Sequence, residues 1–161
     1  MMPQVEDQQV VELADADRLR RSGLRVTAAR LAVLAVLRSG GHQGVEAVGG
    51  AVKERLGTMS TQGVYDVLRV LTQSGLLRRI EPAGSAALFE YRTGDNHHHL
   101  VCRTCLAVAD VDCAVGQAPC LRPSSRSGYL VDEADVTYWG LCPSCQEAHA
   151  DRGTGALGSN R

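Results

Sequence analysis

STQGVYDVLRVLTQSG (residues 60–75) is the stretch that decides how the first half of the chain folds. Its apolar side chains recur at helical spacing between Ser60, which suits an N-cap, and Gly75, which suits a helix end. Two strand-like runs follow, over 76–80 and 87–91, and a Pro/Gly turn separates them. The stretch therefore predicts a helix followed by a short β-hairpin.

Three further helices are predicted before this stretch. The first spans 10–22, the second spans 28–38 behind a Thr27 cap, and the third spans 44–56. Helices followed by a hairpin that carries basic residues are typical of a winged helix-turn-helix, in which the last helix enters the major groove of DNA. The helix that begins after Ser60 is then the reader helix.

The polar face of the reader helix supports this interpretation. An aromatic hydroxyl, an amide and a guanidinium share that face, and such groups hydrogen-bond base edges and phosphates. An ordinary amphipathic helix with a solvated polar face is the alternative. The residues we expect to contact DNA are Ser60, Thr61, Gln62, Tyr65 and Arg69.

Charge is distributed unevenly along the chain, although the formal net charge is only −1. Residues 18–79 hold eleven basic and three acidic residues, whereas residues 93–161 hold five basic and eight acidic ones. The first half is therefore suited to an anionic partner, although a solvated basic face is the alternative. No run of 18 apolar residues and no secretory signal pattern is present, so we expect a cytoplasmic protein without a membrane span.

The pattern changes after the segment TGDN (93–96), which we interpret as a hinge. Short strands replace helices, and a broken helix is the most that the Pro-containing segment 114–127 allows. The fold class is thus α+β, with a winged helix-turn-helix DNA-binding domain followed by a small α/β domain. The expected boundaries are 1–92 for the DNA-binding domain, with 1–9 disordered, 97–146 for the second domain, with strands near 98–103, 106–112 and 129–139, and 147–161 for a disordered tail.

Cys102-x-x-Cys105 and Cys142-x-x-Cys145 form the strongest motif in the chain. Two such pairs supply the four thiolates that structural Zn²⁺ binds tetrahedrally. Four protein ligands fill the tetrahedral zinc ion and leave no position for a substrate, so this zinc site is structural rather than catalytic. The second domain is therefore predicted to be a zinc-containing dimerisation domain, because a small sheet needs a partner and paired reader helices need two half-sites. Free thiols or a redox disulfide are the alternative, which two pairs in one short segment disfavour.

Cys113 and Cys120 stand outside this motif. They are reactive thiols, a disulfide that forms under oxidation, or inert small apolar residues. Neither has a CxxC partner or an adjacent base, so we favour the interpretation as inert small apolar residues.

Three consecutive histidines precede the first cysteine pair. On a strand, His97 and His99 share a face while His98 points away. A following strand can pair back and bring Asp110 to the face of His97 and His99, which gives a nitrogen and carboxylate donor set suited to Fe²⁺, Mn²⁺ or Zn²⁺. The residues alone do not decide whether His42 is a further ligand of this site.

The chain resembles the ferric uptake regulator (Fur) superfamily over about residues 18–146. The motifs that carry the resemblance are TQGVYDVLRVLTQSGL, GDNHHHLVCRTC, ADVDC and YWGLCPSC. They are similar to the peroxide-sensing branch, which includes actinobacterial repressors of catalase-type genes.

The resemblance implies a homodimeric, metal-dependent repressor of a palindromic operator, with structural Zn²⁺ and regulatory Fe²⁺ or Mn²⁺. Peroxide sensing would proceed by oxidation of a ligating histidine, His42 or His97. A further metal site of iron-responsive relatives lacks its histidine here, where Ala134 stands, and Glu90 replaces the Asp of some relatives. The regulatory ligands that the resemblance implies are His42, Glu90, His97, His99 and Asp110.

Three alternatives stay open. The first is a repressor of the same family that responds to iron or zinc supply without self-oxidation. The second is a metalloenzyme, because three histidines and two carboxylates leave room for an open metal position; no nucleophile motif accompanies them, so we expect no enzyme. The third is a zinc-stapled protein-interaction module, which would lack salt-dependent DNA affinity.

Overall fold

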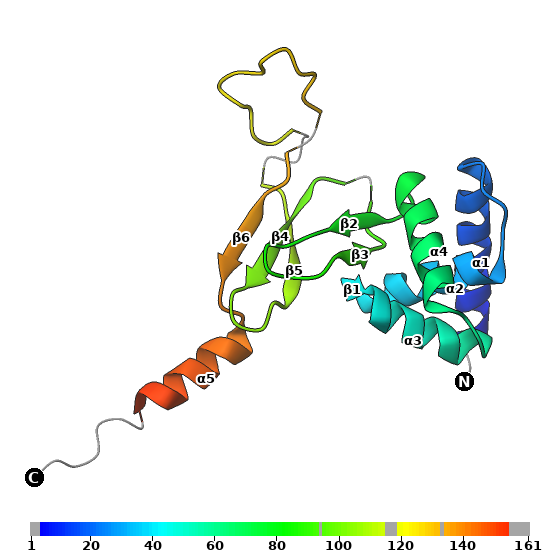
Figure 1. Cartoon of the computed structure of the whole chain (residues 1–161), viewed down its shortest axis with the longest axis horizontal. Helices are drawn as coiled ribbons and strands as arrows, with labels where there is room; N and C mark the ends of the chain where they lie inside the picture. Colours follow the sequence, from blue (N-terminus) through cyan, green and yellow to red (C-terminus); the bar gives the residue numbers. More distant parts are fainter. Residues whose placement is uncertain (1–3, 94, 115–118, 133, 155–161) are drawn as a thin grey trace, which may run out of the picture. The chain divides into compact units, whose positions relative to one another are not determined.

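The computed structural model describes residues 4–93, 95–114, 119–132 and 134–154. The chain divides into two compact units, Met1–Gly94 and Asp95–Arg161. Figure 1 shows helices and a small sheet in the first unit, and a second sheet followed by a C-terminal helix in the second unit. Among the described residues, no helix has both the length and the apolar character needed to cross a membrane.

Four helices make up most of the first unit, and two of them begin where their caps predict. The side chain of Thr27 accepts a hydrogen bond from the N–H of Arg30 at 3.3 Å, and Ser60 accepts one from the N–H of Gly63 at 3.1 Å. The helices are α1 (Gln4–Arg21), α2 (Ala28–Gly40), α3 (Val45–Leu56) and α4 (Thr61–Gln73).

The apolar faces of these helices meet in one core. On α4 the buried side chains are Val64, Leu68 and Leu71, the helical stripe that the sequence predicts. The complete core cluster contains Leu19, Ala32, Val33, Leu34, Val36, Leu37, Val48, Val52, Val64, Leu68, Leu71, Leu76, Leu77 and Phe89.

The predicted hairpin is confirmed as β2 (Arg78–Ile80) paired antiparallel with β3 (Leu88–Glu90). A two-residue strand, β1 (Gln43–Gly44), pairs with the other edge of β3, so the sheet order is β1-β3-β2. This third strand was not predicted, because two residues are too few to show a period. Helices followed by this hairpin confirm the winged-helix architecture.

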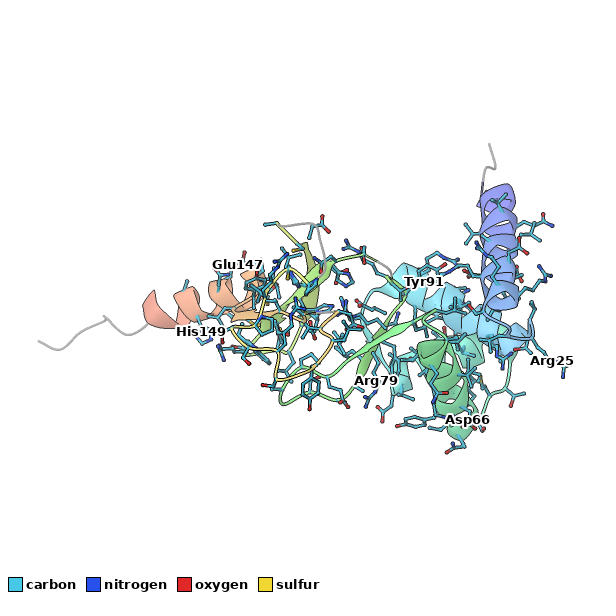
Figure 2. All side chains as sticks on the ribbon, turned by 90° about the horizontal axis from the view of Figure 1, so that it is seen from above. Arg25, Asp66, Arg79, Tyr91, Glu147 and His149 are labelled. Atoms are coloured by element: carbon cyan, nitrogen blue, oxygen red, sulfur yellow. The ribbon has the colours of Figure 1, made fainter. Side chains whose placement is uncertain are left out.

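A buried acid ties the last strand of the first unit to its helices. Asp15 on α1 is only 2% exposed; it accepts a hydrogen bond from the Tyr91 hydroxyl at 2.7 Å and pairs with Arg38 of α2. The guanidinium groups of Arg18 and Arg38 lie 4.4 and 4.7 Å from the centroid of the Tyr91 ring. Tyr91 is labelled in Figure 2. The buried carboxylate of Asp15 thus has both a charged and a hydrogen-bonding partner.

The second unit is a three-stranded mixed sheet of order β5-β4-β6 followed by a helix. Its central strand β4 pairs antiparallel with β5 and parallel with β6. The elements are β4 (His97–Cys102), β5 (Val108–Asp112), β6 (Thr137–Gly140) and α5 (Pro143–Thr154).

Three boundaries differ from the predictions. α1 begins at Gln4 rather than at residue 10, because the polar residues before 10 are themselves helix formers and need no apolar stripe. α5 continues to Thr154, although a disordered tail was predicted from 147; Pro143 at its first position suits a helix start. The strand predicted over 129–139 is confined to Thr137–Gly140.

Candidate metal centres and nucleic-acid interface

The two cysteine pairs come together at the end of the second unit's sheet. Cys102 is the last residue of β4, and its register partner on β6 is Gly140, which brings the segment before α5 alongside it. Cys105 lies in the turn after β4, where Leu106 adopts a positive φ of 61°. One sulfur from each of Cys102, Cys105, Cys142 and Cys145 lies within 4.8 Å of all the others.

The electrostatics of this cluster favour a cation. Backbone N–H groups of Cys105 and Cys142 lower the pKa of Cys102 to about 6, so this sulfur is a thiolate at neutral pH. Contact with Cys142 and burial raise the pKa of Cys145 to about 12, because a second anion beside the first is unfavourable. A divalent ion would displace the remaining protons and neutralise the assembled sulfurs. The donor set and spacing fit tetrahedral Zn²⁺.

One face of the same sheet carries imidazoles and carboxylates. β4 and β5 pair in the predicted register, with His99 opposite Asp110. The Nε2 atoms of His97 and His99 each lie 3.9 Å from Oδ1 of Asp110, and the two rings have centroids 5.0 Å apart. Both histidines are buried, at 1% exposure. The structure thus brings these three predicted ligands together within the second unit.

Two further carboxylates lie near these rings, and the sequence analysis missed both. Asp95 Oδ1 lies 2.8 Å from Nδ1 of His97, within hydrogen-bond distance, whereas Asp135 Oδ1 lies 3.9 Å from Nδ1 of His99 and makes only a longer electrostatic contact. A carboxylate bonded to Nδ1, as at His97, fixes a ring so that Nε2 faces the metal position. Asp95 was detectable as an acid two residues before His97, whereas Asp135 reaches His99 only through the parallel pairing of β6.

The first unit holds the other two predicted ligands. β1 pairs with β3 so that Gln43 faces Phe89, and this places His42 beside Glu90. Nε2 of His42 lies 2.6 Å from Oε2 of Glu90, and both side chains are buried, at 7% and 2% exposure. Arg78 of β2 lies 3.9 Å from the second Glu90 oxygen. A buried imidazole beside a buried carboxylate is a ready pair of N and O donors.

The reader helix presents the predicted polar face. Tyr65 is 51% exposed, and Asp66 accepts hydrogen bonds from Gln62 at 3.4 Å and from Arg69 at 3.3 Å. Thr61 is exposed at the start of α4, and the oxygen of Ser60 serves the helix cap. The structure thus keeps the predicted contact residues on one exposed end and face of α4.

This face borders an open groove of about 860 Å³ in the first unit, lined by α4 and the hairpin. Arg79 of β2 also lines it and is 47% exposed, with its side chain directed outward, as is that of Asp66 (Figure 2). Sequence reasoning noted the basic hairpin but did not single out Arg79. Cationic and hydrogen-bonding groups around a concave surface suit a nucleic-acid backbone.

Comparisons with known proteins agree with this architecture. The chain matches the Ferric uptake regulator family over residues 21–120. "Transcriptional regulator FurA" of Mycobacterium tuberculosis is 53% identical over 137 residues, which is 85% of this chain and 93% of that protein. "Peroxide-responsive repressor PerR" of Staphylococcus aureus is 28% identical over 135 residues, covering 80% of this chain and 87% of PerR.

A solved structure shows the same fold. The ferric uptake regulator from Pseudomonas aeruginosa, determined with manganese, superposes with a TM-score of 0.62 at 27% identity, covering 79% of this chain and 96% of that one. The family match spans most of the chain, and the mycobacterial relative is more than half identical, so the resemblance seen in the sequence motifs is confirmed. The chain belongs to the ferric uptake regulator family.

Proposed function

We propose that this protein is a metal-dependent transcriptional repressor that senses hydrogen peroxide and releases catalase-type defence genes. It acts in the cytoplasm as a homodimer on a palindromic operator. Family membership and the exposed polar face of α4 beside Arg79 support DNA binding. Two copies of the reader helix would contact two half-sites.

Apolar side chains exposed on the second unit support the dimer. Leu100 and Tyr138 are register partners on β4 and β6, and they are 47% and 49% exposed. Such neighbouring exposed apolar groups on a small sheet gain free energy when a second copy covers them.

In this proposal the four thiols of Cys102, Cys105, Cys142 and Cys145 hold structural Zn²⁺. Regulatory Fe²⁺ or Mn²⁺ binds the imidazoles and carboxylates. The observation that carries the proposal is that Nε2 of His97 and of His99 both face Asp110, while the carboxylate of Asp95 holds Nδ1 of His97. This is how proteins orient histidines for a metal ion.

The remaining donors of the regulatory set are His42 and Glu90, which belong to the DNA-binding unit. An ion that takes ligands from both units would couple metal occupancy to the arrangement of the reader helices. Loss of one imidazole ligand would then weaken operator binding, which makes ligand oxidation an effective signal.

Bound Fe²⁺ would lend the electron that splits the O–O bond of peroxide and would regain an electron from the imidazole that is oxidised, so that peroxide is the net two-electron oxidant. The imidazole of His42 or His97 would gain one oxygen atom at a ring carbon, and the second oxygen of peroxide would leave as water. Both side chains are buried, so the oxidised position is held away from bulk reductants. The modified ring is a poorer nitrogen donor, and the repressor leaves its operator.

Peptide mass spectrometry tests this proposal. Protein loaded anaerobically with Fe²⁺ and given a small excess of peroxide should gain one oxygen on peptides that contain His42 or His97. The Mn²⁺-loaded protein should show no gain, and neither should the peptide with the exposed His149 of α5 (Figure 2). Unmodified His42 and His97 at confirmed Fe²⁺ occupancy would refute peroxide sensing.

That refuting outcome would support the second candidate, a repressor that reads iron or zinc supply without self-oxidation. The longer Glu90 side chain, where some relatives carry Asp, is the feature that favours it, since one extra methylene changes the size of the site. Operator binding with each metal, before and after peroxide, separates the two: only the sensor loses binding in its iron form.

A further inference from the structure

The central histidine of the HHH motif faces away from the regulatory ligands. His98 pairs with Val111 of β5, so its side chain lies on the sheet face opposite to His97 and His99. The His98 side chain is nevertheless buried, with only 3% of its surface exposed. The Tyr138 ring lies edge-on to it, with the two ring centroids 6.3 Å apart. A buried imidazole that takes no part in the proposed regulatory site requires a separate explanation.

Two cysteines converge on this ring. Cys113 follows β5 directly, and its backbone N–H donates to the carbonyl of Asn96 at 3.2 Å, which extends the β4–β5 pairing and holds the thiol on the face of His98. Cys120 arrives from the next described segment, and its Sγ lies 3.2 Å from Nε2 of His98. Nε2 and the two sulfurs all lie within 4.8 Å of one another.

The spacing suits a tetrahedral ion. Ordinary Zn–S and Zn–N bond lengths put two sulfur ligands about 3.8 Å apart, and a sulfur and a nitrogen about 3.6 Å apart. The three atoms here need shifts of only a few tenths of an ångström to about one ångström to meet these separations. One imidazole and two thiolates are ligands that Zn²⁺ and softer ions prefer, unlike the carboxylate-rich set on the other face.

We propose that His98, Cys113 and Cys120 form a further metal site of the second unit, which binds Zn²⁺ with a fourth position open. It is separate from the four-cysteine cluster, which shares no ligand with it. The chain would then use the two faces of β4 for different ions: oxygen and nitrogen donors on one, sulfur and nitrogen donors on the other.

Cobalt titration tests this site, because sulfur-to-Co²⁺ charge-transfer absorption reports thiolate ligands and ignores ligands that are only nitrogen or oxygen. The full-length reduced protein is first loaded with one zinc equivalent for the four-cysteine cluster. Added Co²⁺ should then produce a sulfur charge-transfer band that saturates at one equivalent per chain while the zinc stays bound.

Variants assign the band. The double variant Cys113→Ser/Cys120→Ser should abolish it, and His98→Asn should weaken cobalt binding at least tenfold. Asp110→Ala and His149→Ala should leave the band intact, since one lies on the opposite sheet face and the other on α5. Retained zinc and an unchanged circular dichroism spectrum confirm that each variant folds.

Either of two cobalt results would overturn the proposal. The first is that the wild-type protein shows no sulfur band, and the second is that the band survives in the double variant, which would place the cobalt in the four-cysteine cluster. A disulfide between Cys113 and Cys120 that persists in the reduced, metal-saturated protein would also contradict it. The test does not depend on peroxide sensing, because no iron or oxidant is present.

Discussion

The two units of the chain are stabilised by different kinds of side chain. The first buries a cluster of fourteen apolar residues between Leu19 and Phe89. In the second, the buried hydrophobic residues of the described ranges are Val101 and Cys102, and three histidines are buried beside them. A sheet with so little apolar area cannot offset its conformational entropy through burial alone. We therefore expect the second unit to depend on metal ions and on a partner copy for its stability, whereas the first has an apolar core of its own.

Zinc removal should have the largest effect and should act on one unit only. Structural zinc contributes roughly 10–16 kcal/mol to folding in zinc-finger peptides. The few buried apolar side chains of the second unit cannot supply a stabilisation of this size when zinc is removed. Chelation, or the variant Cys142→Ser, should abolish amide hydrogen-exchange protection in β4, β5 and β6 while α2, α3 and α4 keep theirs. Full hydrogen-exchange protection of β4 in the metal-free protein would show that the second unit does not need zinc for its stability.

A core truncation should have the reverse pattern. Leu68→Ala removes a side chain that is 1% exposed at the centre of the first unit's core, and such truncations cost about 2–5 kcal/mol. Urea unfolding should show this loss for the first unit with unchanged zinc content. Leu13→Ala, on the exposed side of α1, is the matched control and should change the free energy of unfolding by less than about 0.5 kcal/mol.

Substitution on the reader helix should affect neither unit's stability but should weaken DNA binding. Arg69→Ala or Tyr65→Ala should cost about 1–3 kcal/mol in operator affinity, measured by fluorescence anisotropy across a salt series. Arg20→Ala removes an equally exposed arginine from α1 and should have little effect. Normal operator binding by either reader-helix variant would mean that another face of α4 contacts DNA.

Much of the first unit could be predicted because its signals are local. The caps at Thr27 and Ser60 and the apolar stripe of α4 lie within a few residues of the structure that they specify. β1 could not be predicted, because its pairing with β3 is set by the tertiary fold rather than by its two residues. This pairing brings His42 beside Glu90, so the sequence could indicate these two ligands only through the family resemblance.

The second unit divides in the same way. The pairing of β4 with β5 followed from the alternation of side chains around the CxxC turn, and the structure confirms that His99 faces Asp110. Sequence analysis took Cys113 and Cys120 as inert because it could not place them beside His98. The contact between Cys120 and His98 joins residues that are 22 positions apart in the sequence, and no local pattern predicts it. Asp135 escaped notice for the same reason, because it reaches His99 through a parallel strand.

The alternating histidines of β4 also limit how this region of the protein can change in length. His99 lies opposite Asp110 because the turn between β4 and β5 has a fixed number of residues. Inserting or deleting one residue there would turn every β5 side chain to the other sheet face, so Asp110 would approach His98 and leave His97 and His99 without their carboxylate. A side chain on this hairpin that binds no metal can be exchanged by itself, but a change in loop length moves several ligands at once. Homologues and engineered variants should therefore accept insertions after β5, in the segment leading to β6, far more readily than between Cys102 and Val108.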